Sequence, residues 1–116
     1  MNFIIQGTLP TMNEIIDASK SHWSVYRKMK EDYTNLVSWS CKRLGPVERV
    51  NILITWYMKD KRQDKDNIMA GTKFILDGLV ASHVLKNDGW KEIGDIHHSF
   101  RIDKKKPRVH VQLIEV

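Results

Sequence analysis

Residues 49–58, RVNILITWYM, form the most hydrophobic strand candidate in the chain and decide how the rest of it folds. The even-numbered positions, from Val50 to Met58, are all apolar, which predicts one buried face of a β-strand. Leu53 and Tyr57 lie on the opposite face, so we expect a central strand that is covered on both sides. The other elements must therefore supply neighbours and covering layers for this strand.

Two segments have the periodicity of helices that could cover the strand. Between residues 23 and 43, apolar side chains recur at steps of three and four, which predicts one buried helical face. Gly45 and Pro46 end this helix, whereas the pattern leaves open whether it begins at Trp23 or earlier, near Asn13 or Glu14. Residues 67–80 repeat the pattern and predict a second, continuous helix.

The ends of the chain supply the remaining strands. Residues 2–8 predict a short strand, followed by a loop at residues 9–13 (LPTMN). Residues 96–102 and 108–116 predict two strands that a basic turn joins as a hairpin. The order β-α-β-α-β-β contains no repeat and no linker. We therefore expect one α+β domain over residues 1–116, in which two helices form one layer and a small mixed sheet the other.

Composition narrows the class of protein. A chain of 116 residues that is 41% hydrophobic and 28% charged can bury the core of one globular domain, which excludes a disordered protein. Cys41 is the only cysteine, which excludes an intrachain disulfide and a zinc site built from cysteines. The formal charge of +5 is compatible with a polyanionic partner. The chain has no apolar run of about 18 residues and no basic leader, so we expect no membrane contact and a cytoplasmic location.

Three aspartates follow the hydrophobic strand within seven positions: Asp60, Asp64 and Asp66. In an extended segment, residues two apart point the same way, so Asp64 and Asp66 could face one hard cation. If both were helical they would lie about 200° apart and could not. A metal site therefore requires Asp64 in the loop and Asp66 at or near the helix start. The same pattern equally fits helix capping, with negative charge at the positive end of the helix dipole.

The second helix adds further candidates for chemistry. Asp66, Lys73 and Asp77 are spaced by seven and four, which places them on one narrow stripe of a continuous helix. Lys73 and Asp77 also fit an ordinary surface pair at i,i+4. Asp88 can join the other acids only if residues 81–87 return toward the helix start. Carboxylates that hold Mg²⁺, together with a lysine that stabilises developing charge, are the groups that phosphodiester hydrolysis needs.

The sequence around these acids resembles a known family of nucleases. The segments YMKDKRQDKDN (residues 57–67), KFILDGL (residues 73–79) and KNDGW (residues 86–90) are similar to the RusA family of Holliday-junction resolvases, which are small dimeric endonucleases associated with phages and prophages. The loop at residues 9–13 resembles the N-terminal loop of that family more weakly. The resemblance is densest between residues 57 and 90.

The resemblance implies roles for individual residues. Asp64, Asp66 and Asp88 match the metal-binding catalytic acids of the family, and Lys73 matches its catalytic lysine when the helix ends are aligned. Counted forward from Asp66, the family's lysine falls at Ala70, three residues before Lys73. Three residues turn a helix by about 300° and advance it by about 4.5 Å, so Lys73 would face the same direction from a shifted position. The flexible stem of lysine can absorb much of that shift.

The resemblance also implies an activity. It predicts an endodeoxyribonuclease that depends on Mg²⁺, or alternatively Mn²⁺, and resolves Holliday junctions by paired phosphodiester hydrolysis in recombination and repair. The substrate would be branched DNA with four arms, and because such a junction has two-fold symmetry, we expect a homodimer. Basic residues beside the acids would bind phosphates, with a second contact from the turn near the C-terminus. These residues are Lys59, Lys61, Arg62, Lys65, Lys104, Lys105 and Lys106.

Other interpretations of the same residues stay open. The run from Lys104 to Lys106 equally fits a solvated turn. A basic nucleic-acid-binding module of the same fold would bind DNA without needing a divalent metal, and a phosphate-handling enzyme for small substrates would show little salt-dependent affinity for DNA. His97 and His98 adjoin in a predicted strand, so they point to opposite faces and cannot share a metal. The aromatic residues are expected in the core, and Trp90 over the helix end.

Overall fold

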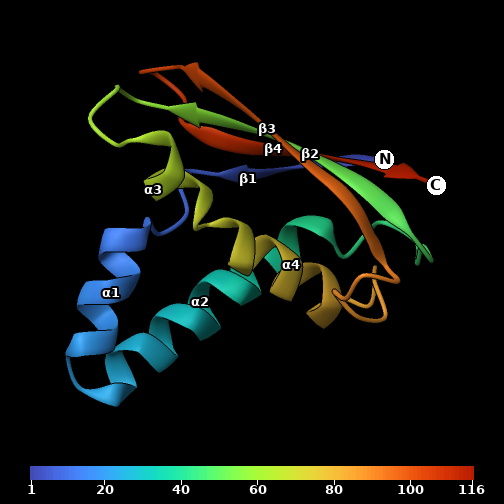
Figure 1. Cartoon of the computed structure of the whole chain (residues 1–116), viewed down its shortest axis with the longest axis horizontal. Helices are drawn as coiled ribbons and strands as arrows, with labels where there is room; N and C mark the ends of the chain where they lie inside the picture. Colours follow the sequence, from blue (N-terminus) through green and yellow to red (C-terminus); the bar gives the residue numbers. More distant parts are fainter.

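Strand β2 (Val50–Met58) lies inside a four-stranded mixed sheet with the strand order β1-β4-β2-β3. The computed structural model describes residues 1–116. All the helices lie on one side of the sheet, so the domain has two layers (Figure 1). This confirms the expected α+β class. The other elements are β1 (Asn2–Gln6), α1 (Met12–Lys20), α2 (Trp23–Cys41), α3 (Lys65–Met69), α4 (Thr72–Ala81), β3 (Ile93–Ile102) and β4 (Arg108–Glu115).

The last two strands do not form the expected hairpin. β3 pairs with β2 in parallel and β4 pairs with β2 antiparallel, so the two strands lie on opposite sides of β2. The turn between them passes across the end of β2, where the backbone N–H of Asp103 donates to the carbonyl oxygen of Met58 at 2.8 Å. The hairpin prediction was wrong because backbone groups of a buried strand need partners on both sides, and β2 takes both.

The helix expected from residue 23 is present as α2, and a separate helix, α1, precedes it. α1 begins at Met12, inside the segment expected to be a loop, because Thr11 and Glu14 form a capping box. The Thr11 hydroxyl accepts from the Glu14 backbone N–H at 3.3 Å, and the Glu14 carboxylate accepts from the Thr11 backbone N–H at 3.2 Å. α1 ends at Lys20, and His22 caps the start of α2. The expected helix is therefore confirmed as the long helix α2, and the helix before it is separate.

The second helical region breaks between α3 and α4, so the prediction of one continuous helix was wrong. Gly71 lies at the break, packed against Leu9 and the buried ring of Trp56. A Cβ at this position would lie 2.9 Å from the Leu9 Cβ and 3.1 Å from the Trp56 ring, so only glycine fits without displacement. The chain thus changes direction at a tertiary contact. As a result, Asp66 and Lys73 belong to different helices and share no stripe.

The core lies between the helices and one face of the sheet. The even-numbered residues of β2 from Val50 to Trp56 are buried there, as the sequence predicts, and Cys41 is fully buried at the end of α2. The odd-numbered residues of β2 are only half-buried, because no element covers the other face (Figure 1). The expectation that β2 is covered on both sides was therefore wrong. No helix has the length and apolar character that a membrane crossing requires.

Candidate active site

Asp64 and Asp66 lie at the start of α3, just beyond the loop that leaves β2. Asp64 has an extended backbone (φ −67°, ψ 154°) in the position before the helix, and Asp66 lies in its first turn. This is the arrangement that the spacing of the two acids requires for a shared cation. The backbone therefore meets the condition for a shared cation, although α3 begins at Lys65 and not near Asn67 as the sequence predicts.

The carboxylates of this pair are free of protein partners. Asp64 forms no side-chain hydrogen bond to the helix it precedes, so the capping interpretation finds no support at this residue. Both side chains are exposed. The four ion pairs of the domain engage other acids, namely Asp32, Asp60, Asp77 and Asp103. The oxygens of Asp64 and Asp66 are therefore available to an external ligand.

The pair borders an open cavity of about 740 Å³. Its apolar lining residues include Phe100 and Ile102 of β3. Its polar lining residues combine the acids with basic and amide groups. Asp64 and Asp66 also border a second, smaller hollow on the α1 side. The polar residues of the larger cavity are Asp60, Lys61, Gln63, Asp64, Lys65, Asp66 and Arg101.

Asn67 fixes the start of α3 to the start of α1. Its side-chain oxygen accepts a hydrogen bond from the backbone N–H of Asn13 at 2.9 Å, and its amide group donates to the side-chain oxygen of Gln63. The residue thus joins three segments beside the acidic pair. Asn67 belongs to the motif in the sequence, but its role was not foreseen because the Asn13 partner is 54 positions away.

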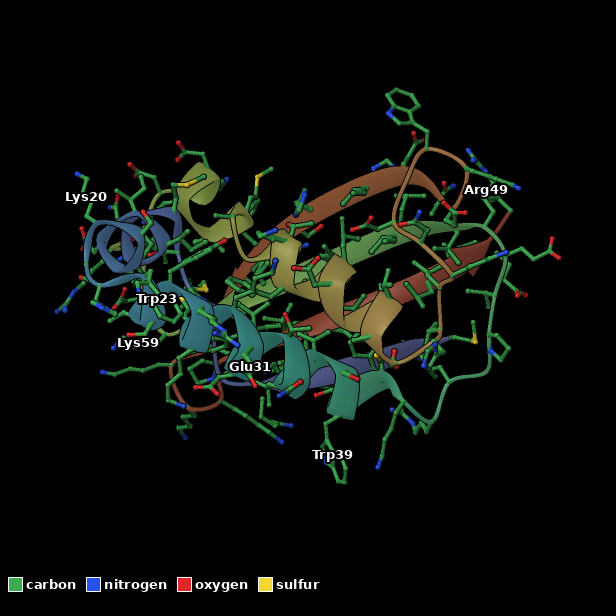
Figure 2. All side chains as sticks on the ribbon, turned by 90° about the horizontal axis from the view of Figure 1, so that it is seen from below. Lys20, Trp23, Glu31, Trp39, Arg49 and Lys59 are labelled. Atoms are coloured by element: carbon green, nitrogen blue, oxygen red, sulfur yellow. The ribbon has the colours of Figure 1, made fainter.

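Asp88 lies at the other end of the sheet from Asp64 and Asp66. The turn that contains it is tied to the start of β2, because Val50 donates its backbone N–H to the carbonyl of Glu92 at 3.0 Å. Arg49 also donates to the carbonyls of Trp90 and Lys91, at 2.9 and 3.2 Å. Figure 2 shows Arg49 and Lys59, which flank β2, at opposite ends of the molecule. Nine residues of extended strand span on the order of 30 Å.

The parallel pairing of β2 and β3 explains this separation. In a strand–helix–strand crossover, the connection that follows the helix returns to the end of the sheet where the first strand began. Asp88 therefore cannot fold back onto the start of α3 within one chain. The domain holds no group of three or more His, Cys, Asp or Glu side chains arranged to bind a metal. Asp88 instead borders a separate hollow with Leu76 and Ile93.

Lys73 points to a partner on its own helix. Its ammonium lies 3.7 Å from a carboxylate oxygen of Asp77, which is the i,i+4 pair that the sequence offered as the alternative. Lys73 borders neither of the hollows that contain the acidic pair.

Trp90 is 96% exposed and does not pack over the helix end, contrary to expectation. Trp23 and Trp39 on α2 also point into solvent (Figure 2).

The predicted basic residues all lie at the end of the sheet that holds the acidic pair. Lys61 and Lys65 border the larger cavity, whereas Lys59 and Arg62 border a neighbouring hollow that includes the loop from Gly7 to Leu9. Arg62 lies 3.6 Å from Asp60. The turn with Lys104, Lys105 and Lys106 follows Asp103, whose backbone is bonded to the end of β2.

That basic turn is organised around Asp103. The carboxylate accepts from Arg108 at 2.8 Å and from the backbone N–H groups of Lys105 and Lys106. The hydrogen bond from Arg108 is the main cause that lowers the pKa of Asp103, and the backbone N–H of Lys106 adds to it. The three lysine side chains are exposed. The turn therefore has a fixed backbone and free ammonium groups.

Sequence reasoning missed several residues that line the larger cavity. Phe100 and Arg101 come from β3, and Gln63 comes from the loop. Phe100 and Arg101 reach the cavity because β3 runs parallel to β2 and ends beside it, with Arg101 opposite Tyr57. Strand pairing of this kind leaves no local signal in the sequence. Asp60 also lines the cavity but is engaged with Arg62.

Comparisons with known proteins add no relative. No protein-family model matches the chain, and no curated protein matches it. The resemblance to RusA resolvases therefore rests on residues 57–67, 73–79 and 86–90.

Proposed function

We propose that the protein is a metal-dependent, structure-selective endodeoxyribonuclease that resolves Holliday junctions by paired phosphodiester hydrolysis. One observation carries the proposal: Asp64 and Asp66 have free carboxylates on the wall of one cavity, beside Lys61 and Lys65. Acidic ligands for a metal, surrounded by cations for phosphate, are what hydrolysis of a phosphodiester requires.

The chemistry of the donor set fits a hard divalent cation. Mg²⁺ prefers oxygen ligands and is commonly held by one or two carboxylates while it keeps several waters. Asp64 and Asp66 would hold it, and Mn²⁺ would suit the same oxygens. When bound, the ion would polarise the phosphate and activate a water. Asp60 contributes less because its carboxylate is engaged with Arg62 and with the Arg62 backbone N–H.

The basic residues of the cavity would bind and orient the phosphate. Lys61 and Lys65 border the cavity together with the acids, and Arg101 reaches it from β3. A cation near the scissile phosphate stabilises the negative charge that grows in the transition state. Lys73 is engaged with Asp77, so we assign this role to Lys65 or Lys61 in preference to Lys73.

A homodimer would also explain how Asp88 could contribute to the site although it lies far from Asp64 and Asp66 in its own chain. Within one chain, Asp88 lies near the start of β2, while Asp64 and Asp66 lie beyond its end. Two copies related by a two-fold axis, packed so that opposite ends of their sheets meet, would bring Asp88 of one copy to the acidic pair of the other. Two such composite sites would match the two cuts that a two-fold junction needs.

A second candidate function is a basic nucleic-acid-binding module without turnover. Two observations favour it: no three acidic side chains of the chain are arranged to bind one metal, and Lys73 is paired with Asp77. Such a module would use the same lysines for phosphate contacts and would bind equally well with and without divalent metal.

Incubation with an end-labelled four-way junction distinguishes the two. At low salt the nuclease makes symmetric cuts with Mg²⁺ and none with EDTA, whereas linear duplex of the same sequence stays intact. Junction binding without cleavage in either Mg²⁺ or Mn²⁺, by a protein shown to be dimeric, contradicts the nuclease and supports the binding module.

A further inference from the structure

The face of the sheet that no helix covers carries an ordered set of polar side chains. The odd-numbered residues of β2 point to this face, and the strand registers align their neighbours in rows across the sheet. We call the three rows nearest the acidic loop the open sheet face. Its rows are Gln6, Arg108, Tyr57 and Arg101; then Ile4, His110, Thr55 and Ser99; then Asn2, Gln112, Leu53 and His97.

The charge on the open sheet face has one sign. Its twelve positions include two arginines and two histidines and no acidic residue. Both arginines lie in the row at the end of β2, where the sheet adjoins the basic turn with Lys104, Lys105 and Lys106. Asp103 offsets the charge of Arg108, so the free positive charge at this end comes from Arg101 and the three lysines of the turn, which favours an anionic partner.

Arg108 and Tyr57 form a rigid centre in that row. The guanidinium carbon of Arg108 lies 3.8 Å from the centroid of the Tyr57 ring, and its Nη1 donates to Asp103 at 2.8 Å. The same Nη1 also donates to the carbonyl of Lys106 at 2.9 Å, so the guanidinium is held in place over the ring and presents a fixed planar surface. A planar cation over an aromatic ring is a platform on which a nucleobase can stack.

Arg101 is the free cation of the row. Its side chain is exposed and donates only to the carbonyl of the adjacent Phe100, at 2.8 Å, with no carboxylate partner. Arg101 also borders the cavity that contains Asp64 and Asp66. The residue therefore lies where the open sheet face meets the candidate active site, so one strand could contact both.

The chemistry of the face argues against a second copy of the chain as its partner. Ile4 is its one exposed large apolar residue, at 44%, and Leu53 is half-buried. Protein interfaces have cores that are apolar and poor in charged residues, which this face is not. A DNA duplex would offer a flat face little more than phosphates. An extended single strand also offers bases to the rings, hydroxyls and amides.

We propose that the open sheet face binds single-stranded nucleic acid, with a phosphate on Arg101 and a base stacked at the Arg108–Tyr57 pair. This binding goes beyond the proposed function, because it requires neither metal nor cleavage. The open sheet face would bind the unpaired strand that leads into the cavity.

The test measures fluorescence anisotropy of a labelled oligothymidylate in EDTA, at several salt concentrations. Arg101→Gln should lower the slope of log affinity against log salt by about 0.7, the contribution of one phosphate contact on a single strand. Arg101→Lys should restore most of that slope. Tyr57→Thr should weaken binding about fivefold or more through lost stacking. Lys30→Gln, which removes one exposed charge from α2, should change little beyond the general electrostatic effect.

Thermal unfolding shows whether each variant is folded. If Tyr57→Thr does not fold, the Arg101 variants still test the proposal, because the side chain of Arg101 is exposed. Equal salt slopes for Arg101→Gln and Lys30→Gln overturn the proposal. The proposal is also overturned if the protein binds duplex more tightly than single strand. The same holds if a variant of this face loses self-association but keeps its affinity for DNA. A protein that cuts no junction but loses single-strand binding in Arg101→Gln supports this inference while contradicting the nuclease.

Discussion

The side-chain oxygen of Asn67 accepts a hydrogen bond from the backbone N–H of Asn13 at 2.9 Å, which ties the start of α3 to the start of α1. Because Asn67 also bonds Gln63, its side chain sets the geometry of the segment that carries Asp64 and Asp66. The acidic pair thus depends on a contact between segments that are far apart in sequence.

The first prediction concerns this contact. Asn67→Ala should cost only about 1 kcal/mol of stability, because the hydrogen bond is solvent-exposed. It should weaken metal binding more clearly, by about tenfold, as the loss of a group that orients the ligands does. Titration with Mn²⁺, followed by paramagnetic broadening of NMR signals, measures the affinity. Asn67→Asp keeps the acceptor for Asn13 and should lose less; an unchanged affinity in Asn67→Ala would remove the positioning role.

The second prediction is a pH dependence of stability at His98. Burial is the main cause that lowers the pKa of this imidazole below its ordinary 6.5, and the charge of His97 adds to it. The unfolded chain therefore binds a proton at a pH where the folded chain does not, so stability is present above about pH 6.5 and is lost as pH falls below it. Chemical unfolding at pH 7 and pH 5 measures the difference.

A matched pair of variants isolates that effect. His98 accepts the indole N–H of Trp56 at 3.0 Å, and His98→Asn keeps an acceptor there without a titrating group. This variant should lose less stability than the wild type between pH 7 and pH 5. His83→Asn is the control, because His83 is exposed and its positive φ of 64° suits asparagine. Equal losses in the wild type and His98→Asn would show that His98 is not responsible.

The third prediction concerns the packing of α2 against α4. A Cβ on Gly78 would overlap the side chain of Val37 and lie 3.0 Å from the backbone nitrogen of Ser38. Gly78→Ala should therefore destabilise the domain by about 1–3 kcal/mol. Val37→Ala removes the Cγ1 atom nearest to the added Cβ but keeps the Val37 Cβ beside it, so the double variant should lose only somewhat less than the sum of the single variants.

Gly45→Ala is the control for that cycle, because no atom lies within 4 Å of the Cβ it would add. Its free energy of unfolding should change by less than about 0.5 kcal/mol. Denaturant unfolding measures all four proteins. Strict additivity of Val37→Ala and Gly78→Ala would mean that the two helices adjust without contact between these positions.

Local chemistry made part of the site predictable from sequence. The alternation at Val50 to Met58 indicates the strand, and the two-residue spacing of Asp64 and Asp66 requires the extended backbone that is observed at Asp64. The break at Gly71 was not predictable, because it depends on contact with Leu9 and Trp56. A glycine inside a helical pattern does not indicate a break in the helix unless its tertiary neighbours are known.

The position of Asp88 depended on topology instead of spacing. A hairpin of the last two strands would leave the direction of β3 relative to β2 open, and the sequence offers no local signal for the parallel pairing. That pairing alone decides which end of the sheet Asp88 occupies. For the same reason, Arg101 could not be predicted as a cavity residue, because its register with Tyr57 brings it to the cavity.

The fourth prediction tests whether two chains share one site. If Asp88 of one copy completes the acidic pair of the other, Asp66→Asn and Asp88→Asn should each abolish junction cleavage. A dimer reassembled from a mixture of the two variants contains one intact site, so nicking should return. The mixture should nick one strand and should not make paired cuts. No recovery from proven heterodimers would place the required acids within one chain or exclude Asp88.

The central claim is that Asp64 and Asp66 hold the metal that cuts DNA. Single-turnover cleavage of a labelled four-way junction across a Mg²⁺ titration tests it most directly, with wild type, Asp66→Asn and the control Asp17→Asn on α1 compared. We expect cleavage by the wild type and the control to rise with Mg²⁺, and Asp66→Asn to bind the junction but cut at least about 100-fold more slowly. Cleavage by Asp66→Asn at the wild-type rate, or no cleavage by any of the three proteins, would contradict the account.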